Sequence, residues 1–257
     1  MKTAILVISF GSSHLDALRS GIESIERDIA RAFPACDVFR AFTSGMIIRK
    51  LKRERDLAID APEEAIRRIA DAGYDRLVLV PTHVIAGFEY EKVNRLCDQW
   101  RDAAVFSSIS ITTPLLYDDA DYAALARIME AQAESAAGTV LWMGHGSEHA
   151  ANASYAKLQA RLPAHVQIGC VEGSPELADL LPALRAGETR TVTLMPLMIV
   201  AGDHAKNDMA GDEDDSWKCI LEKEGFQVDV RLKGLGEYTE VRALFVDRVE
   251  RALRREL

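Results

Sequence analysis

Two stretches of the chain, RLVLVPTHVIAGFEYEKV (76–93) and RTVTLMPLMIVAGDHAKND (190–208), decide the fold because each repeats the other. They share a proline and an Ala-Gly pair at matching places: Pro81 with Pro196, and Ala86-Gly87 with Ala201-Gly202. A second match places the segment 10–13 (FGSS) over 145–148 (HGSE). The repeated segments predict an internal duplication of one supersecondary unit.

Apolar strand patterns alternate with amphipathic helix patterns on both sides of these stretches. We expect strands at 4–9, 38–43, 77–80, 139–143, 166–171 and 191–195, and helices at 15–29, 63–70, 175–184 and 241–253. A further helix is expected after the turn at 144–147, running through Tyr155 and Leu158. This alternation predicts parallel sheets that are covered by helices on both faces. We therefore expect an α/β fold of two flavodoxin-like lobes, residues 1–120 and 121–257, with a cleft between them and the last helix packing back.

Composition and charge exclude several classes of protein. The 257 residues are 48% hydrophobic and 28% charged, which excludes a disordered or low-complexity chain. The net charge is −9 and the basic residues are scattered, which disfavours a nucleic-acid partner. The longest apolar stretches are about half of the ~20 residues that a membrane-spanning helix needs, so no membrane partner is expected.

The four cysteines are far apart and form no C-x-x-C pair. We interpret them as reduced thiols, as expected for a cytoplasmic protein. The apolar stretch near Met1 imitates a secretion signal, but no small-x-small cleavage site follows it, so we do not expect export.

In open α/β sheets, ligands bind beyond the carboxyl ends of the strands. At these ends the duplicated loops differ in the residues that could bind a ligand, since His145 stands where the first lobe has Phe10 and His204 where it has Glu89. Glu172 follows the strand at 166–171 in a Gly-flanked turn. We expect His145, Glu172 and His204 to meet at one rim, with Glu89 facing them from the other lobe.

Two imidazoles and one carboxylate suit a first-row divalent metal ion and leave a coordination position open. The three residues are 27 and 32 positions apart, so they form no compact metal-binding motif. The prediction depends on their shared position at strand ends.

Each of these residues also has a structural interpretation. His145 could be a turn residue, His204 a helix cap, Glu172 a carboxylate favoured by a helix dipole, and Glu89 part of a solvated helix face. Among the remaining histidines, His83 follows a strand end but aligns with Met198, so we expect a wall position, with a role as a ligand as the alternative. We expect His14 and His149 at capping or surface positions and His165 at a solvent-exposed position.

The segment 208–217 (DMAGDEDDSW) carries five acids within eight residues. A solvated loop is the first interpretation, and a weak cation site or a surface that attracts hydrated metal are the alternatives. Ser12, Ser13 and Ser147 could be nucleophiles, but the G-x-S-x-G elbow is absent. The glycines at 11 and at 144–146 match no phosphate-binding motif.

Five motifs follow one another along the chain: SFGSS (9–13), HVIAGFEYEKV (83–93), MGHGS (143–147), VEGSP (171–175) and LMIVAGDHAKNDMAGDEDDSW (197–217). In these motifs the sequence resembles the anaerobic sirohydrochlorin cobaltochelatases, class II chelatases related to ferrochelatase. The resemblance implies two flavodoxin-like lobes around a tetrapyrrole cleft. It also implies insertion of Co²⁺ into sirohydrochlorin, with release of two protons, in anaerobic cobalamin synthesis.

The resemblance further implies that His145, Glu172 and His204 are the metal ligands. His145, His204 and Glu89 would be catalytic, with Glu89 accepting protons or orienting the ring. The implied substrate contacts are Phe10, Gly11, Ser12, Met143 and Met198. The implied partners are the tetrapyrrole and the divalent ion, and no cofactor is expected beyond the substrate metal, Co²⁺ or else Fe²⁺ or Ni²⁺.

The alternatives come from different classes of protein. A ferrochelatase or nickel chelatase would act on the same ring. A two-lobed binding protein would close on a small molecule or metal without chemistry, and a metal-dependent hydrolase would turn over esters or phosphates. Association into a homo-oligomer is left open by the sequence.

Overall fold

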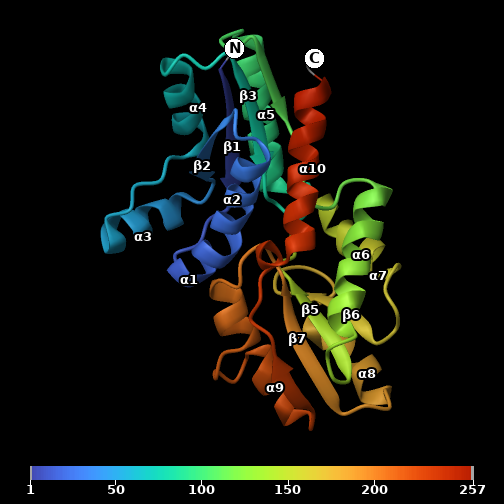
Figure 1. Cartoon of the computed structure of the whole chain (residues 1–257). Coiled ribbons are helices and arrows are strands. Elements are labelled where there is room, and N and C mark those ends of the chain that lie inside the picture. Colours follow the sequence, from blue (N-terminus) through green and yellow to red (C-terminus); the bar gives the residue numbers. More distant parts are fainter. Residues whose placement is uncertain (1, 256–257) are drawn as a thin grey trace. The chain divides into compact units, whose positions relative to one another are not determined.

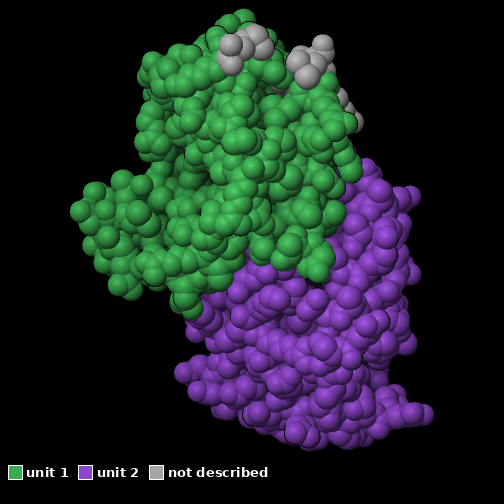
Figure 2. Space-filling model, viewed as in Figure 1, with its two compact units in different colours: residues 1–115, 239–257 green, residues 116–238 purple. Residues whose placement is uncertain are grey.

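The computed structural model describes residues 2–255, which form two compact units (Figures 1 and 2). Unit 1 contains residues 1–115 and 239–257, and unit 2 contains residues 116–238. These limits differ from the expected lobes, 1–120 and 121–257, because the C-terminal helix α10 (Thr239–Arg255) belongs to unit 1.

The position of α10 follows from its contacts in unit 1. It packs against α2 (Glu23–Ala32) and β3 (Arg76–Pro81). Arg242 Nε donates a hydrogen bond to Asp28 of α2 at 2.5 Å. The buried Arg248 guanidinium bonds the carbonyl oxygen of Leu115 at 3.0 Å. The helix therefore completes the core of unit 1.

Unit 1 contains a four-stranded, fully parallel sheet with the order β2-β1-β3-β4. The strands are β1 (Thr3–Ser9), β2 (Asp37–Phe42), β3 and β4 (Ser108–Ile111). The remaining helical segments of the unit are α1 (Leu15–Ala17), the π-helical η1 (Leu18–Ile22), α3 (Gly45–Arg55), α4 (Pro62–Asp71) and α5 (Phe88–Asp102).

Unit 2 repeats this topology with the order β6-β5-β7-β8, again fully parallel. Its strands are β5 (Thr139–Gly144), β6 (Val166–Cys170), β7 (Thr191–Leu197) and β8 (Gln227–Val230). Its helical segments are α6 (Asp119–Ala133), η2 (Ala150–Asn152), α7 (Ala153–Gln159), α8 (Leu177–Ala186), η3 (Ala205–Met209), α9 (Trp217–Lys223) and η4 (Leu235–Glu237). The expected duplicated α/β fold with parallel sheets is confirmed.

The central strands carry apolar residues without alternation because both faces of each sheet are covered. In β1, Ala4, Leu6 and Ile8 join one core cluster, while the intervening Ile5 and Val7 are also fully buried. The predicted helix at 15–29 is present as the continuous series α1, η1 and α2. The short edge strands β4 and β8 escape the sequence prediction, since each has four residues and only partial burial.

Among the described residues, no helix combines the length and the apolar character that a membrane span requires.

The first prediction concerns the attachment of α10. Phe245 is fully buried, so Phe245→Ala leaves a cavity and should lower the free energy of unfolding by about 3–5 kcal/mol in chemical denaturation. The control on the same helix is Glu250→Ala, at an exposed residue paired with Arg254, which should change it by less than about 0.5 kcal/mol. Similar losses in both variants would contradict the role given to Phe245.

Candidate metal centre

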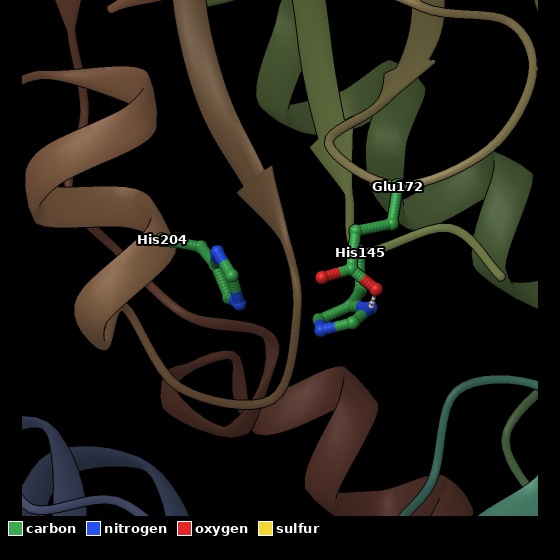
Figure 3. Close-up of side chains that lie close together, drawn as sticks. All are labelled: His145, Glu172 and His204. Atoms are coloured by element: carbon green, nitrogen blue, oxygen red, sulfur yellow. Dashed lines mark ion pairs between the residues drawn. The ribbon is translucent and has the colours of Figure 1, made fainter.

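The structure brings together the three residues that the sequence singled out as metal ligands. One potential ligand atom from each of His145, Glu172 and His204 lies within 4.8 Å of the others (Figure 3). The two imidazole centroids are 4.8 Å apart, with the rings at 89° to each other. Donors at about 2.1 Å from one ion lie up to about 4.2 Å apart, so small side-chain rotations would place this set around a single ion.

Strand pairing explains why residues so distant in the chain meet here. Gly144, the last residue of β5, pairs with Cys170 at the end of β6 on one side and with Leu197 at the end of β7 on the other. The chain continues from β5 into His145 and from β6 into Glu172. Because β6 and β7 lie on opposite sides of β5, the loops after β5 and β7 also mark the topological switch point where ligands bind in such sheets.

The turn at His145 is held tightly against the Glu172 segment. Val171 N–H donates to Gly144 O at 3.0 Å, and Glu172 N–H donates to His145 O at 2.7 Å. Gly146 has a φ of +82°, and a Cβ there would lie 1.5 Å from the carbonyl oxygen of Glu172. A glycine at this position therefore permits the close approach of the two ligand-bearing loops.

His204 is held by the loop that follows β7. Within this loop, Met198 O accepts a hydrogen bond from Leu235 N–H at 2.7 Å, and Ile199 O accepts one from Gly236 N–H at 2.9 Å. The chain then turns into the π-helical η3, a type of distortion that is frequent at functional sites. Buried residues of η3 anchor the segment that presents His204.

Hydrogen bonds orient both imidazoles. His204 Nδ1 lies 2.7 Å from Asp208 Oδ2, and His145 Nδ1 lies 3.0 Å from Gly146 O. A carboxylate and a carbonyl can only accept, so each Nδ1 carries the proton and Nε2 becomes the nitrogen with a lone pair for a metal. The side chains of His145, Glu172 and His204 are 43%, 64% and 35% exposed, so the donor set is open to a further ligand.

Sequence reasoning missed the role of Asp208. In the sequence it belongs to the acidic segment 208–217, and its position four residues after His204 places both side chains on one helical face. Asp208 is the kind of carboxylate that orients a metal-binding histidine. Beyond it, the acids 212–215 are exposed, and Asp212 and Asp214 pair with Lys218 and Lys223 at 2.6 and 2.8 Å, as a solvated loop would.

Other groups near the cluster do not extend the donor set. Burial raises the pKa of the Cys170 thiol to about 12, so it stays protonated and is a poor metal ligand. His149 caps η2 by accepting from Ala151 N–H at 3.0 Å, and His165 is exposed, as the sequence predicted.

Met143 requires a correction. It was expected to line the substrate site, but it is fully buried in the core cluster of unit 2 beneath the turn. Its side chain therefore packs the sheet and has no surface to offer a ligand. Met198 is half-buried against the same core.

In unit 1, the expected contacts at the end of β1 also need revision. The side chain of Phe10 is 47% exposed. Gly11 and Ser12 are buried: a Cβ on Gly11 would lie 2.6 Å from the Phe42 ring, and Ser12 Oγ accepts from His14 N–H at 3.2 Å. Of these three residues, only Phe10 presents a side chain that a ligand could reach.

Glu89 lies in the first turn of α5, in unit 1. Its Oε1 pairs with Lys92 Nζ at 2.5 Å, and its Oε2 is buried without a hydrogen-bond partner among the described residues. Both ring nitrogens of His83 are likewise buried and unpartnered in the part of the chain that the structure describes. Burial lowers the pKa of His83 to about 4, against a smaller opposing effect of the Glu89 charge, so the ring is neutral at neutral pH.

The chain is similar to known proteins over nearly its whole length. A family model described as "Cobalt chelatase (CbiK)" matches residues 3–254. The sirohydrochlorin cobaltochelatase of Salmonella typhimurium is 42% identical over 98% of this chain and 97% of its own length. The sirohydrochlorin cobaltochelatase CbiKC of Nitratidesulfovibrio vulgaris is 32% identical over 98% and 91%.

Solved structures show the same fold at low sequence identity. SirB from Bacillus subtilis with Fe³⁺ superposes with a TM-score of 0.64 at 15% identity, covering 97% of this chain and 95% of that one. CbiX, described as the terminal enzyme of sirohaem biosynthesis in denitrifying bacteria, gives a TM-score of 0.58 at 20% identity, covering 98% and 99%.

A second prediction tests the contact between the two ligand loops. Gly146→Ala should lower the affinity for Co²⁺ at least tenfold in isothermal titration calorimetry, because the added Cβ must displace the Glu172 backbone. The matched control is Gly225→Ala in the same unit: its φ is +84°, but a Cβ there meets nothing within 4 Å. Both variants carry a left-handed backbone strain of about 1–2 kcal/mol, so equal affinities in the two variants would remove the steric explanation.

A third prediction concerns Asp208. Asp208→Asn should weaken Co²⁺ binding about 10- to 100-fold, since the ring of His204 loses the carboxylate that fixes its tautomer and orientation. Asp212→Asn, in the exposed acidic loop, removes the same charge and should leave the affinity within about twofold. If the two substitutions weaken binding equally, general charge rather than orientation explains the role of Asp208.

Proposed function

Because the chain belongs to the cobalt chelatase family, we propose that it inserts Co²⁺ into sirohydrochlorin, with release of two protons, in anaerobic cobalamin synthesis. The observation that supports this best is the open cluster of His145, Glu172 and His204 at the carboxyl edge of the unit 2 sheet. An open site is what a transfer reaction needs, since the ion must leave the protein with the ring.

We assign the capture of the ion to the cluster. A hydrated Co²⁺ ion would exchange water for two imidazole nitrogens and one carboxylate oxygen, donors that suit a first-row divalent metal. The exposed side of the cluster leaves the remaining positions for water and then for ring nitrogens. His204 is oriented through Asp208, and His145 through the Gly146 carbonyl.

The ring must lose its two pyrrole N–H protons as the nitrogens replace the protein ligands on the ion. The reaction balances as Co²⁺ plus the free ring giving the cobalt complex and two protons. We assign to Glu89 the acceptance of a proton or the orientation of the ring. Its buried Oε2, to which none of the described residues is hydrogen-bonded, suits either task. His145 and His204 can accept a proton once the ion has left them, which gives them a catalytic role in addition to ligation.

Of the expected substrate contacts, Phe10 and Met198 are the side chains with accessible surface, and we propose that they contact the ring. The substrate metal could be Fe²⁺ or Ni²⁺ instead of Co²⁺, because the affinities of such donor sets for these ions follow a general order. A cytoplasmic location is proposed from the four cysteines, all of which are free thiols.

The fourth prediction tests the function directly. Under anaerobic conditions, the wild-type protein should convert the absorption spectrum of sirohydrochlorin to that of its cobalt complex, and parallel reactions with Fe²⁺ and Ni²⁺ give the metal preference. His145→Ala and His204→Ala should each lower kcat/KM more than about 100-fold, since each removes a ligand. Both variants should remain folded, because His145 and His204 lie beyond the ends of their strands, are partly exposed and are not members of the core cluster of unit 2.

His165→Ala is the matched control, since it removes an exposed histidine from the same unit without touching the cluster. It should insert cobalt at the wild-type rate. Wild-type rates in His145→Ala or His204→Ala would exclude the role assigned to that residue. A wild-type protein that binds Co²⁺ and sirohydrochlorin without any spectral conversion would instead be a binding protein.

A further inference from the structure

The side chain of Asn152 links the two loops that carry His145 and Glu172. Its Nδ2 donates a hydrogen bond to Ser174 O at 2.7 Å, two residues beyond Glu172. Its Oδ1 accepts a hydrogen bond from Ser147 N–H at 3.0 Å, two residues beyond His145. One of these bonds needs a donor and the other an acceptor. A side-chain amide can therefore make both, whereas a carboxylate or a hydrocarbon cannot.

The neighbouring backbone leaves room for this bridge. Asn152 is the last residue of η2, the short helix that follows the His145 turn, and it is partly buried. A Cβ on Gly173 would lie 3.1 Å from Ser147 N and 3.3 Å from Asn152 Oδ1, the two atoms that one of the hydrogen bonds joins. A glycine at position 173 therefore keeps the Glu172 loop from pressing on that bond.

The bond to Ser147 N–H also fixes the carbonyl group that orients His145. The C=O of Gly146 and the N–H of Ser147 belong to one planar trans peptide unit, so the direction of one determines the direction of the other. Gly146 O accepts from His145 Nδ1–H at 3.0 Å, while Ser147 N–H donates to Asn152 on the opposite side. Asn152 thus acts on the His145 imidazole through a single rigid peptide plane.

This peptide plane needs support because a glycine precedes it. Gly146 has a φ of +82° and no side chain, so the backbone rotates more freely there than at other residues. The peptide before Gly146 is tied to its surroundings, since Glu172 N–H donates to His145 O at 2.7 Å and Gly146 N–H donates to the buried Tyr155 hydroxyl at 3.5 Å. Asn152 ties the peptide after Gly146. Without that bond, the peptide can rotate and carry the Gly146 carbonyl away from His145.

We propose that Asn152 is a positioning residue of the metal centre, which fixes the orientation of the His145 ring and joins its loop to the loop of Glu172. The inference rests on the proposed function, in which His145 is a metal ligand. It gives His145 a support equivalent to the one that His204 receives from Asp208. All of these residues belong to unit 2, so the proposal depends on the geometry of one compact unit.

The fifth prediction uses Asn152→Ala in the full-length protein. The substitution removes both hydrogen bonds, and alanine favours the helical φ and ψ angles of −56° and −27° at this position. The affinity for Co²⁺ in isothermal titration calorimetry should fall about tenfold, as expected when a metal-binding histidine loses the group that orients it.

Proton NMR of the Co²⁺-loaded protein distinguishes positioning from a general loss of structure. The unpaired electrons of Co²⁺ shift the exchangeable Nδ1–H signals of ligating imidazoles, and the signal that is missing in His145→Ala belongs to His145. In Asn152→Ala this signal should broaden or disappear, because its proton loses a fixed acceptor, while the signal of His204 should remain. Asn152→Asp retains an oxygen that can accept from Ser147 N–H and should preserve the His145 signal.

The matched control is Gln159→Ala on α7. Gln159 makes the same pair of amide hydrogen bonds, donating to Val166 O at 2.9 Å and accepting from Ile168 N–H at 2.8 Å, but both bonds go to strand β6 instead of the ligand loops. Its affinity for Co²⁺ should remain within about twofold of the wild type, as for independent sites, with both histidine signals intact. Circular dichroism establishes that each variant is folded.

The outcomes separate this proposal from the proposed function. A wild-type affinity or an intact His145 signal in Asn152→Ala, or equal losses in Gln159→Ala, would overturn the positioning role. Loss of the His145 signal in Asn152→Asp would also overturn it, because the bond to Ser147 would then not be what holds the ring. A wild-type protein that binds Co²⁺ but never inserts it contradicts the proposed function and leaves this inference standing. A wild-type protein that binds no Co²⁺ overturns both.

Discussion

The parallel pairing of β5 with both β6 and β7 is the constraint on which the metal centre depends. This pairing fixes Gly144 beside Cys170 and Leu197, so strands β5, β6 and β7 end next to one another. The loops that follow these strands therefore bring His145, Glu172 and His204 together. A slip of one residue in either pairing would turn every side chain of that strand to the opposite face. The buried apolar residues of these strands resist such a slip. The core of unit 2 thus specifies the position of residues that lie outside it and are partly exposed.

At the metal centre, one set of atoms holds the ligand loops rigidly and another set, the donor atoms, is open to solvent. Backbone hydrogen bonds, the close approach at Gly146 and the Asp208 carboxylate hold the ligand loops, while the donor atoms face outward. A structural metal site would close its coordination shell with protein atoms. Three donors with an accessible face suit an ion that is held only until a better ligand, the tetrapyrrole nitrogens, replaces them.

The α/β class, the duplication and the meeting of the three ligands could be predicted because strong local signals determine them. Buried strands such as 77–80 are continuously apolar, and strand-end residues such as His145 must lie at one edge of a parallel sheet. Features set by contacts distant in the sequence could not be predicted. We expected the last helix to pack back but assigned it to the second lobe, whereas its membership of unit 1 depends on pairs such as Arg242 with Asp28. The burial of Met143 depends on helices that pack in the same core cluster. The edge strands β4 and β8 were missed because four half-buried residues carry little periodicity.

The return of α10 to unit 1 has a consequence for how the protein is made. Unit 2 is one uninterrupted segment, 116–238, enclosed in the sequence by the two parts of unit 1. During synthesis, unit 2 is therefore complete before α10 has been made. Until α10 is made, the surface of α2 and β3 against which it packs stays uncovered. Unit 1 therefore folds last, and its apolar surface stays exposed longest on the nascent chain. Chaperones would bind, or aggregation would begin, at this surface.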